Sequence, residues 1–140
     1  DGSIRQEAED FTEQFGIKVK EQIDGGNSQG IGDISNDDWT SYSKIDFGNS
    51  AEPFTFRVRV SAPKEGGSIV LRLNSPTGTI VGTVPVTSTN GWNNYKTISV
   101  TLNGIRGIHK LYLCYAGESE NLFNLNWFEW TSLTRKARKH

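Results

Sequence analysis

The chain has few of the residues from which catalytic centres and covalent cross-links are built. Its 140 residues include one cysteine, Cys114, which excludes an internal disulfide. The histidines are His109 and His140, and no Ser-His-Asp or Cys-His set can be assembled around them. We therefore expect no catalytic activity, although the 16 acidic residues leave a pair of glycosidase-type carboxylates as an alternative.

Long apolar segments and a strong net charge are also absent. No apolar run approaches the roughly 20 residues of a membrane helix, and no signal-like segment opens the chain. The net charge of −1 gives no electrostatic reason to expect nucleic acid or an anionic membrane as a partner. We therefore expect a domain of a longer protein, with any export signal outside this segment.

Alternating apolar and polar residues run through most of the chain. In the segment TFRVRVS, Phe56, Val58 and Val60 would share one face of a strand. Similar runs occupy residues 68–75, 97–102 and 110–115. Turn signals such as Asn90-Gly91 separate the runs, and short strands at this spacing predict an all-β sandwich.

The two ends of the chain depart from this pattern. The spacing of Ala8, Phe11 and Phe15 also fits a short amphipathic helix, but the glycine that follows favours an extended opening. Residues 133–140 are basic and lack apolar anchors. We therefore predict one β-sandwich over residues 1–132, followed by a basic tail or linker.

The segment LFNLNWFEW, residues 122–130, places two amides inside an aromatic strand. With a strict period of two, Asn124 and Asn126 would share a face with Phe128 and Trp130. The opposite face would carry Phe123, Leu125, Trp127 and Glu129. Burying an unpaired amide costs roughly 1–3 kcal/mol. Each amide is therefore either paired inside the protein or available to something outside it.

Aromatic residues are the most abundant chemical resource of the chain. Among its four tryptophans, Trp92 directly follows an Asn-Gly turn and Trp39 lies in DDWTSY, and loop aromatics are usually partly exposed. A pyranose has an apolar face and a polar rim, so it suits flat rings beside amides and carboxylates. These residues indicate carbohydrate binding, with a protein-interaction sandwich as the main alternative.

A series of motifs makes this indication specific. In chain order they are QEAEDF, GGNSQGIGDISNDDWTSY, IDFG, FTFRVRV, GGSIVLRL, NGW, GIHKLYL and LFNLNWF. Through these motifs the chain resembles the family 6 carbohydrate-binding modules over residues 5–131. The resemblance implies a jelly-roll β-sandwich of two antiparallel sheets that binds polysaccharide and catalyses nothing.

The resemblance also implies a biological setting. Such modules are usually attached to the catalytic domain of a glycoside hydrolase, so we expect a monomeric module of an extracellular, secreted enzyme. We expect β-1,3-glucan of the laminarin type as ligand. Agarose, xylan and mixed-linkage glucan are alternative polymers, and a structural or protein-interaction sandwich without a sugar site is an alternative function.

Two sugar-binding places are implied by the resemblance. In the loop site, Trp92 matches the stacking tryptophan and Asn124 the hydrogen-bonding amide, whereas Asp33 stands where the family has a second ring. A tyrosine from another segment could replace that ring. The candidates are Tyr42, Tyr95 and Tyr115. As an alternative, Trp92 is a lid over the edge of the core.

The second place is the concave face of the sandwich. Trp39 matches a position that stacks on glycan chains in some members of the family, and Ser41 follows it on the same strand face. Arg72 lies on the outward side of its own strand and could donate hydrogen bonds. The alternative is that Trp39 packs beneath the loop of residues 25–30.

A structural Ca²⁺ is the last implication. Glu7 and Glu9 are two residues apart, so in a strand both carboxylates lie on one side and suit a hard cation, although a solvated face has the same spacing. The resemblance adds carbonyl oxygens from the following loop, for which we select Asn27 and Gly30. It also adds an acid near the chain end, where this sequence has Asn126.

Overall fold

The computed structural model describes residues 3–24, 27–49, 53–65, 67–118 and 120–132. The predicted tail, residues 133–140, lies outside the described residues. The described part consists of strands and their connections, and it contains no helix that could span a membrane.

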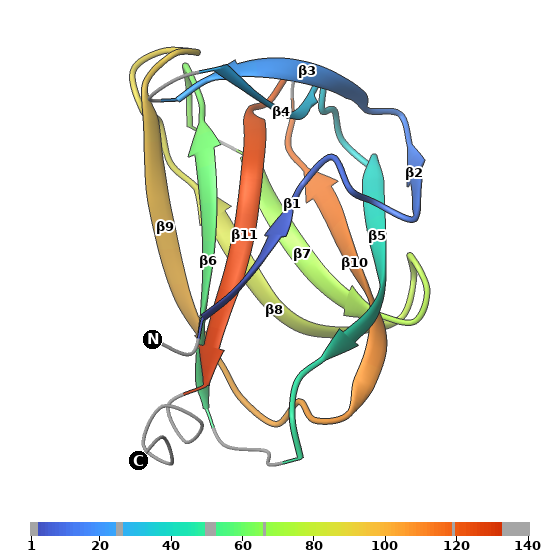
Figure 1. Cartoon of the computed structure of the whole chain (residues 1–140). Helices are drawn as coiled ribbons and strands as arrows, with labels where there is room; N and C mark the ends of the chain where they lie inside the picture. The colour runs from blue at the N-terminus through green and yellow to red at the C-terminus, as the bar shows by residue number, and fades with distance from the viewer. Residues whose placement is uncertain (1–2, 25–26, 50–52, 66, 119, 133–140) are drawn as a thin grey trace.

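Within these described ranges, eleven strands form two sheets, and every strand pair is antiparallel. The six-stranded sheet contains β1 (Ser3–Glu7), β3 (Lys18–Ile23), β4 (Asn27–Gly32), β6 (Phe54–Ser61), β9 (Tyr95–Leu102) and β11 (Asn124–Ser132). The five-stranded sheet contains β2 (Glu13–Phe15), β5 (Trp39–Asp46), β7 (Gly67–Leu73), β8 (Thr79–Val86) and β10 (Ile108–Ala116). The predicted all-β sandwich of two antiparallel sheets is confirmed (Figure 1).

Strand order explains which segments meet. The larger sheet runs β3-β4-β11-β6-β9, with β1 also paired to β11, and the smaller runs β2-β5-β10-β7-β8. The last described strand, β11, therefore lies in the middle of its sheet, where it pairs with β1, β4 and β6. The opening segment is extended, as predicted, and forms β1 and β2 rather than a helix.

The core lies between the sheets and follows the predicted alternation. Phe56, Val58 and Val60 of β6 are fully buried, as are Ile69 and Leu71 of β7. Burying apolar surface is worth about 25 cal/mol per Å². In a chain without an internal disulfide, this packing is the main source of stability.

The predicted division of residues 122–130 into two faces is wrong, because β11 contains a bulge. Leu125 pairs with Val60, but the next paired residue, Trp127, pairs with Arg59, so Asn126 is an extra residue in the ladder. The bulge shifts the alternation, and Leu125 therefore lies in the core together with Phe128.

Different strands and connections lie at the two ends of the sandwich. Strands β3 and β4 cross one end, near the connection between β8 and β9 (Figure 1). Strand β1 begins and β11 finishes at the opposite end (Figure 1). The loops predicted to bind sugar therefore lie at the opposite end of the sandwich from the start of β1 and the finish of β11 (Figure 1).

Candidate functional site

An open pocket of about 540 Å³ lies at the loop end of the sandwich. It is lined by Val19, Lys20, Glu21, Asp33, Trp92, Asn121 and Asn124. Three of these residues, Asp33, Trp92 and Asn124, are the ones that the sequence assigned to the loop site. The structure brings them together from three separate segments of the chain.

Trp92 supplies the apolar surface of the pocket. The turn before it has Asn90 and Gly91 at φ values of 68° and 154°, a backbone that asparagine and glycine adopt most easily. The Asn94 amide N–H donates to the Gly91 carbonyl oxygen at 3.4 Å. The ring of Trp92 is 40% exposed, so it is available to a ligand rather than sealed over the core.

Asn124, the first residue of β11, supplies a half-buried amide. Gly32 of β4 lies directly beside it, because a Cβ added at Gly32 would stand only 2.7 Å from Asn124 Oδ1. Glycine at position 32 therefore leaves the space that the amide occupies. This contact holds Asn124 at the pocket wall.

An ion pair forms another part of the wall, at the position where the sequence resemblance implied a second ring. Lys20 Nζ donates to Asp33 Oδ1 at 2.9 Å, and the two side chains are 50% and 36% exposed. The Lys20 stem lies against Gly32, next to Asn124. The wall therefore offers a carboxylate and an ammonium group.

Sequence reasoning missed Lys20 and its neighbours Val19 and Glu21. Lys20 pairs with Gly30 in the β3–β4 hairpin, which brings it to the same end as Asp33. The available signal was the alternation of KVKEQI, which gives an edge strand two lysines on one side. This alternation points to Lys20 only when the register of the β3–β4 hairpin is known.

Tyr42 was predicted as a replacement ring, and this prediction is wrong. Its side chain is 2% exposed, and its hydroxyl donates to the Ala8 carbonyl oxygen at 2.8 Å. Burial raises the pKa of the phenol well above its usual range. Tyr115 is also buried, and the Tyr95 hydroxyl donates to the buried Gln22 amide oxygen. None of these tyrosines lines the pocket, and Trp92 is therefore the aromatic residue among its described lining residues.

Trp39 and Arg72 lie on the outer face of the five-stranded sheet. Trp39 pairs with Phe15 of β2, and its ring centroid is 5.2 Å from that of Tyr112. Arg72 pairs with Tyr112 and donates from Nη1 to the Gly78 carbonyl oxygen at 2.8 Å. Phe15, which is 59% exposed, and Tyr112 join the predicted residues on this face.

The residues predicted to hold Ca²⁺ include two orphaned oxygen atoms. Glu9 Oε1 and Asn126 Oδ1 are buried and have no hydrogen-bond partner within the described ranges. The Ala8 N–H donates to the Asn126 carbonyl oxygen at 3.1 Å, which brings the segment between Glu7 and Glu9 next to the bulge. Desolvation, and then the charges of Glu7 and Asp10, raise the pKa of Glu9, although a backbone hydrogen bond opposes this. These oxygen donors fit a hard cation.

The rest of the predicted metal site is less complete. Gly30 lies against the Leu125 carbonyl oxygen, one residue before Asn126. Asn27 pairs with Ile23 through its backbone, and its side chain lies outside the described ones. Among the described residues, no group of three or more His, Cys, Asp or Glu side chains could hold a metal. A cation here would therefore need amide and backbone oxygens.

The fold and the pocket together define a class of protein. An antiparallel β-sandwich with an exposed indole, amides and a carboxylate around an open pocket at its loop end has the groups that a sugar-binding site requires. Residues 7–132 match the family model described as carbohydrate binding module (family 6). The chain belongs to this family.

Similar proteins include enzymes and isolated modules. The chain is 38% identical to an arabinoxylan arabinofuranohydrolase of Paenibacillus polymyxa over 134 residues, which cover 93% of this chain and 21% of that enzyme. A family 6 module from Clostridium cellulolyticum in complex with xylose has a TM-score of 0.82 and 40% identity, covering 89% of this chain and 94% of that one.

A third relative is described as binding β-1,3-glucan. The β-1,3-glucan-binding family 6 module from Bacillus halodurans has a TM-score of 0.80 and 34% identity, covering 89% of this chain and 92% of that one. The chain spans 14–25% of the length of the curated relatives it matches. It therefore corresponds to one module of such proteins.

Proposed function

We propose that this chain is the non-catalytic module that anchors a secreted glycoside hydrolase to a polysaccharide, and that its loop pocket binds β-1,3-glucan of the laminarin type. The carrying observation is the pocket with one exposed ring, Trp92, and a polar Lys20–Asp33 wall. Relatives that contain this module as a small part of a hydrolase support the anchoring role.

Each pocket group has a chemical task in this proposal. The apolar C–H face of a sugar stacks on Trp92, and the amides of Asn121 and Asn124 bind hydroxyls at its rim. The Asp33 carboxylate has two acceptor oxygens and can bind two adjacent hydroxyls of one sugar unit. Lys20 donates to a ligand oxygen while it remains next to Asp33.

The shape of the pocket favours a chain end. One ring with a polar wall does not form the two-sided apolar clamp that suits the interior of a flat chain. In a linear β-1,3-glucan, the linkage oxygen separates the free hydroxyls of every interior unit. Adjacent free hydroxyls therefore occur at the two chain ends, and the terminal non-reducing unit is the one that we expect Asp33 to bind.

The central experiment compares two tryptophan substitutions. We expect Trp92→Ala to weaken the binding of laminarihexaose in calorimetry by about 1–3 kcal/mol, the scale of a lost aromatic anchor. Its melting temperature should change little, since the ring is 40% exposed. Trp39→Ala is the matched control and should keep the affinity. The reverse result would place the site on the five-stranded sheet.

The polymer and the absence of catalysis are tested on the unaltered chain. Native gels containing laminarin, lichenan, xylan, agarose or hydroxyethylcellulose should retard it most strongly in the laminarin lane. Periodate cleaves the bond between two carbons that carry neighbouring hydroxyls. If the chain end is the ligand, linear β-1,3-glucan that has been oxidised with periodate and reduced with borohydride should no longer bind the module. Release of reducing sugar from these polymers would contradict the non-catalytic role.

Xylan is the second candidate ligand. The solved module with bound xylose and the arabinoxylan-degrading relative both favour it. Interior units of β-1,4-xylan also carry adjacent hydroxyls, so the Lys20–Asp33 wall fits them too. Tighter binding of xylohexaose than of laminarihexaose would favour xylan over β-1,3-glucan.

We also propose a structural Ca²⁺ held by Glu7, Glu9 and Asn126 with backbone carbonyl oxygens. Its support is the pair of buried, unpartnered oxygens of Glu9 and Asn126. The ion would neutralise the glutamates and connect the end of β1 to β11. A chelator should lower the melting temperature, and an unchanged melting temperature would contradict the proposal.

A further inference from the structure

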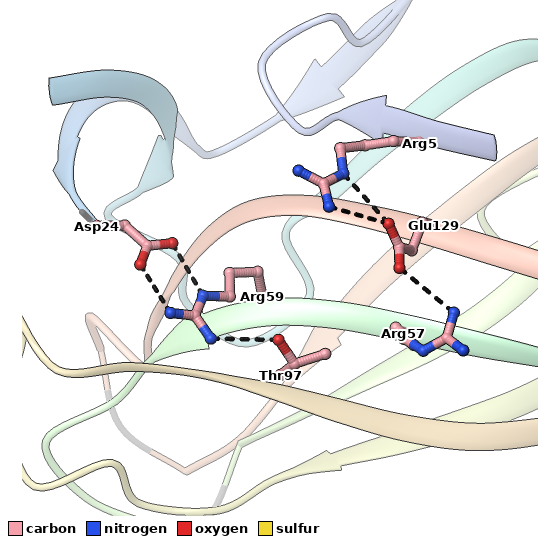
Figure 2. A network of polar contacts seen from close by, with 6 residues as sticks. All are labelled: Arg5, Asp24, Arg57, Arg59, Thr97 and Glu129. Atoms are coloured by element: carbon pink, nitrogen blue, oxygen red, sulfur yellow. Dashed lines mark hydrogen bonds and ion pairs between the residues drawn. The ribbon is translucent and has the colours of Figure 1, made fainter. Parts of the chain in front are cut away.

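Behind the bulge of β11 lies a polar cluster centred on Asp24, the residue that follows β3. Arg59 of β6 donates to both of its carboxylate oxygens, from Nε at 2.9 Å and from Nη2 at 2.8 Å. Arg59 Nη1 also donates to Thr97 Oγ1 at 3.2 Å (Figure 2). Two strands of the sheet therefore hold the Asp24 carboxylate in one orientation.

Asp24 in turn fixes the side chain of Asn126. Asn126 Nδ2 donates to Asp24 Oδ2 at 3.0 Å. A carboxylate accepts hydrogen bonds and cannot donate them, so a flipped amide would place Oδ1 against Asp24 and be repelled. The amide therefore has one permitted orientation, with Oδ1 turned away from Asp24.

The opposite end of the amide is the unpartnered one. Asn126 is 5% exposed, and its Oδ1 has no hydrogen-bond partner among the described residues. The Asn126 backbone carbonyl accepts from the Ala8 N–H, so the bulge is tied to the segment that carries the two glutamates. The cluster thus holds the unpartnered Asn126 Oδ1 in one orientation, on a residue whose backbone is bonded to that segment.

We propose that Asp24 and Arg59 are positioning residues that fix Asn126 as an oxygen ligand of the structural cation. The inference rests on the proposed Ca²⁺ site and adds two residues to it that would not contact the ion.

The same geometry explains why position 126 carries an amide. An aspartate there would place one carboxylate oxygen against Asp24, and two adjacent carboxylates repel each other. Converting Asp24 to asparagine would remove this conflict, because its amide N–H can donate to an aspartate at position 126. The effects of substitutions at positions 24 and 126 on Ca²⁺ affinity are therefore expected to be strongly non-additive.

The experiment measures Ca²⁺ binding to the purified chain by calorimetry, with the melting temperature in Ca²⁺ and in chelator as a second readout. We expect Asp24→Ala to weaken Ca²⁺ affinity by about tenfold to a hundredfold, the usual loss when a supporting residue behind a metal ligand is removed. Equal affinity of Asp24→Ala and the unaltered chain would overturn the inference.

A second set of variants covers the case in which Asp24→Ala fails to fold. Asn126→Asp alone should not bind Ca²⁺ more tightly than the unaltered chain, whereas Asn126→Asp combined with Asp24→Asn should bind more tightly than either single variant. Additive effects of the two changes would contradict the positioning role.

The matched control lies on the same sheet. Glu129 of β11 accepts from Arg5 at 3.1 Å and from Arg57 at 3.3 Å, in a cluster separate from Asp24 (Figure 2). Glu129→Gln makes a similar change of charge and should leave Ca²⁺ affinity unaltered. If the unaltered chain itself binds no Ca²⁺, the cation proposal fails and the inference with it, whereas sugar binding in that sample shows that the protein is folded.

Discussion

Asp33 determines the character of the pocket through one backbone conformation and one ion pair. Its φ of 53° lies in the left-handed region, which aspartate adopts more readily than most residues. Its carboxylate is paired with Lys20, which itself lies over Gly32. A ring at this position would stack on a sugar face, whereas under the proposed function the ion pair would bind hydroxyls. This single position would therefore favour recognition of a sugar edge.

Asp38 is a buried carboxylate with a defined effect on stability. Its side chain is 7% exposed, and its Oδ2 accepts from the Ser35 N–H at 2.8 Å. Desolvation raises its pKa above the ordinary 3.8, despite that hydrogen bond. The folded state therefore binds this proton more tightly than the unfolded state. Stability must fall as pH rises from 3.8 through the raised pKa, and this loss persists at neutral pH.

We expect Asp38→Asn to remove this loss, because an amide can accept from Ser35 without carrying charge. The variant should melt at a higher temperature than the unaltered chain at pH 7, and the difference should disappear below the ordinary aspartate pKa of 3.8. Asp46→Asn, at an exposed position, is the control. A difference that is constant across this pH range would show that ionisation of Asp38 is not the cause.

At the level of strands, the sequence predicts regular elements better than irregular ones. The alternation in β6, β7 and β10 is local, so their buried faces could be predicted from the residue order. The bulge at Asn126 depends on how β11 pairs with β6, which no local pattern contains. The strict period of two therefore gave the wrong faces for residues 122–130.

The candidate site shows the same limit. Trp92 and Asn124 could be assigned from their motifs, and the structure places both at one pocket. Lys20 could not, because its partner is 13 residues away and is reached through the hairpin register. The burial of Tyr42 could not be predicted from the sequence either, because its hydroxyl bonds to the carbonyl oxygen of Ala8, which is distant along the chain.

Tyr42 connects the two sheets, and replacing it tests how much this connection stabilises the fold. Its phenol extends from β5 to the segment after β1, and its oxygen also lies 3.0 Å from Thr40 Oγ1, within hydrogen-bond distance. We expect Tyr42→Phe to lower the free energy of unfolding by about 1–3 kcal/mol, because the buried Ala8 carbonyl loses a donor. Denaturant unfolding measures this loss.

Sugar binding is the control for that substitution. Because Tyr42 is in the core and not in the pocket, Tyr42→Phe should bind laminarihexaose with unchanged affinity at a temperature where it is folded. Weakened binding with unchanged stability would mean that the hydroxyl belongs to a ligand site after all.

For the molecule as a whole, the position of the pocket matters as much as its chemistry. The pocket lies at the end crossed by β3 and β4, and β1 begins and β11 finishes at the other end (Figure 1). A catalytic domain joined on either side would therefore leave the pocket free to face a polymer. We expect a single open pocket to bind with modest affinity, so anchoring would depend on how many pockets act together.

This dependence can be measured with two copies of the chain joined by a flexible linker. On insoluble β-1,3-glucan, which presents many chain ends on one surface, the tandem should bind at least about tenfold more tightly than one copy, because the second binding event is intramolecular. On laminarihexaose the affinity per pocket should not change, since each molecule offers one end. A tandem in which one copy carries Trp92→Ala should lose the gain. If that tandem binds the polymer as tightly as the intact one, contacts outside the loop pocket hold the module on its substrate.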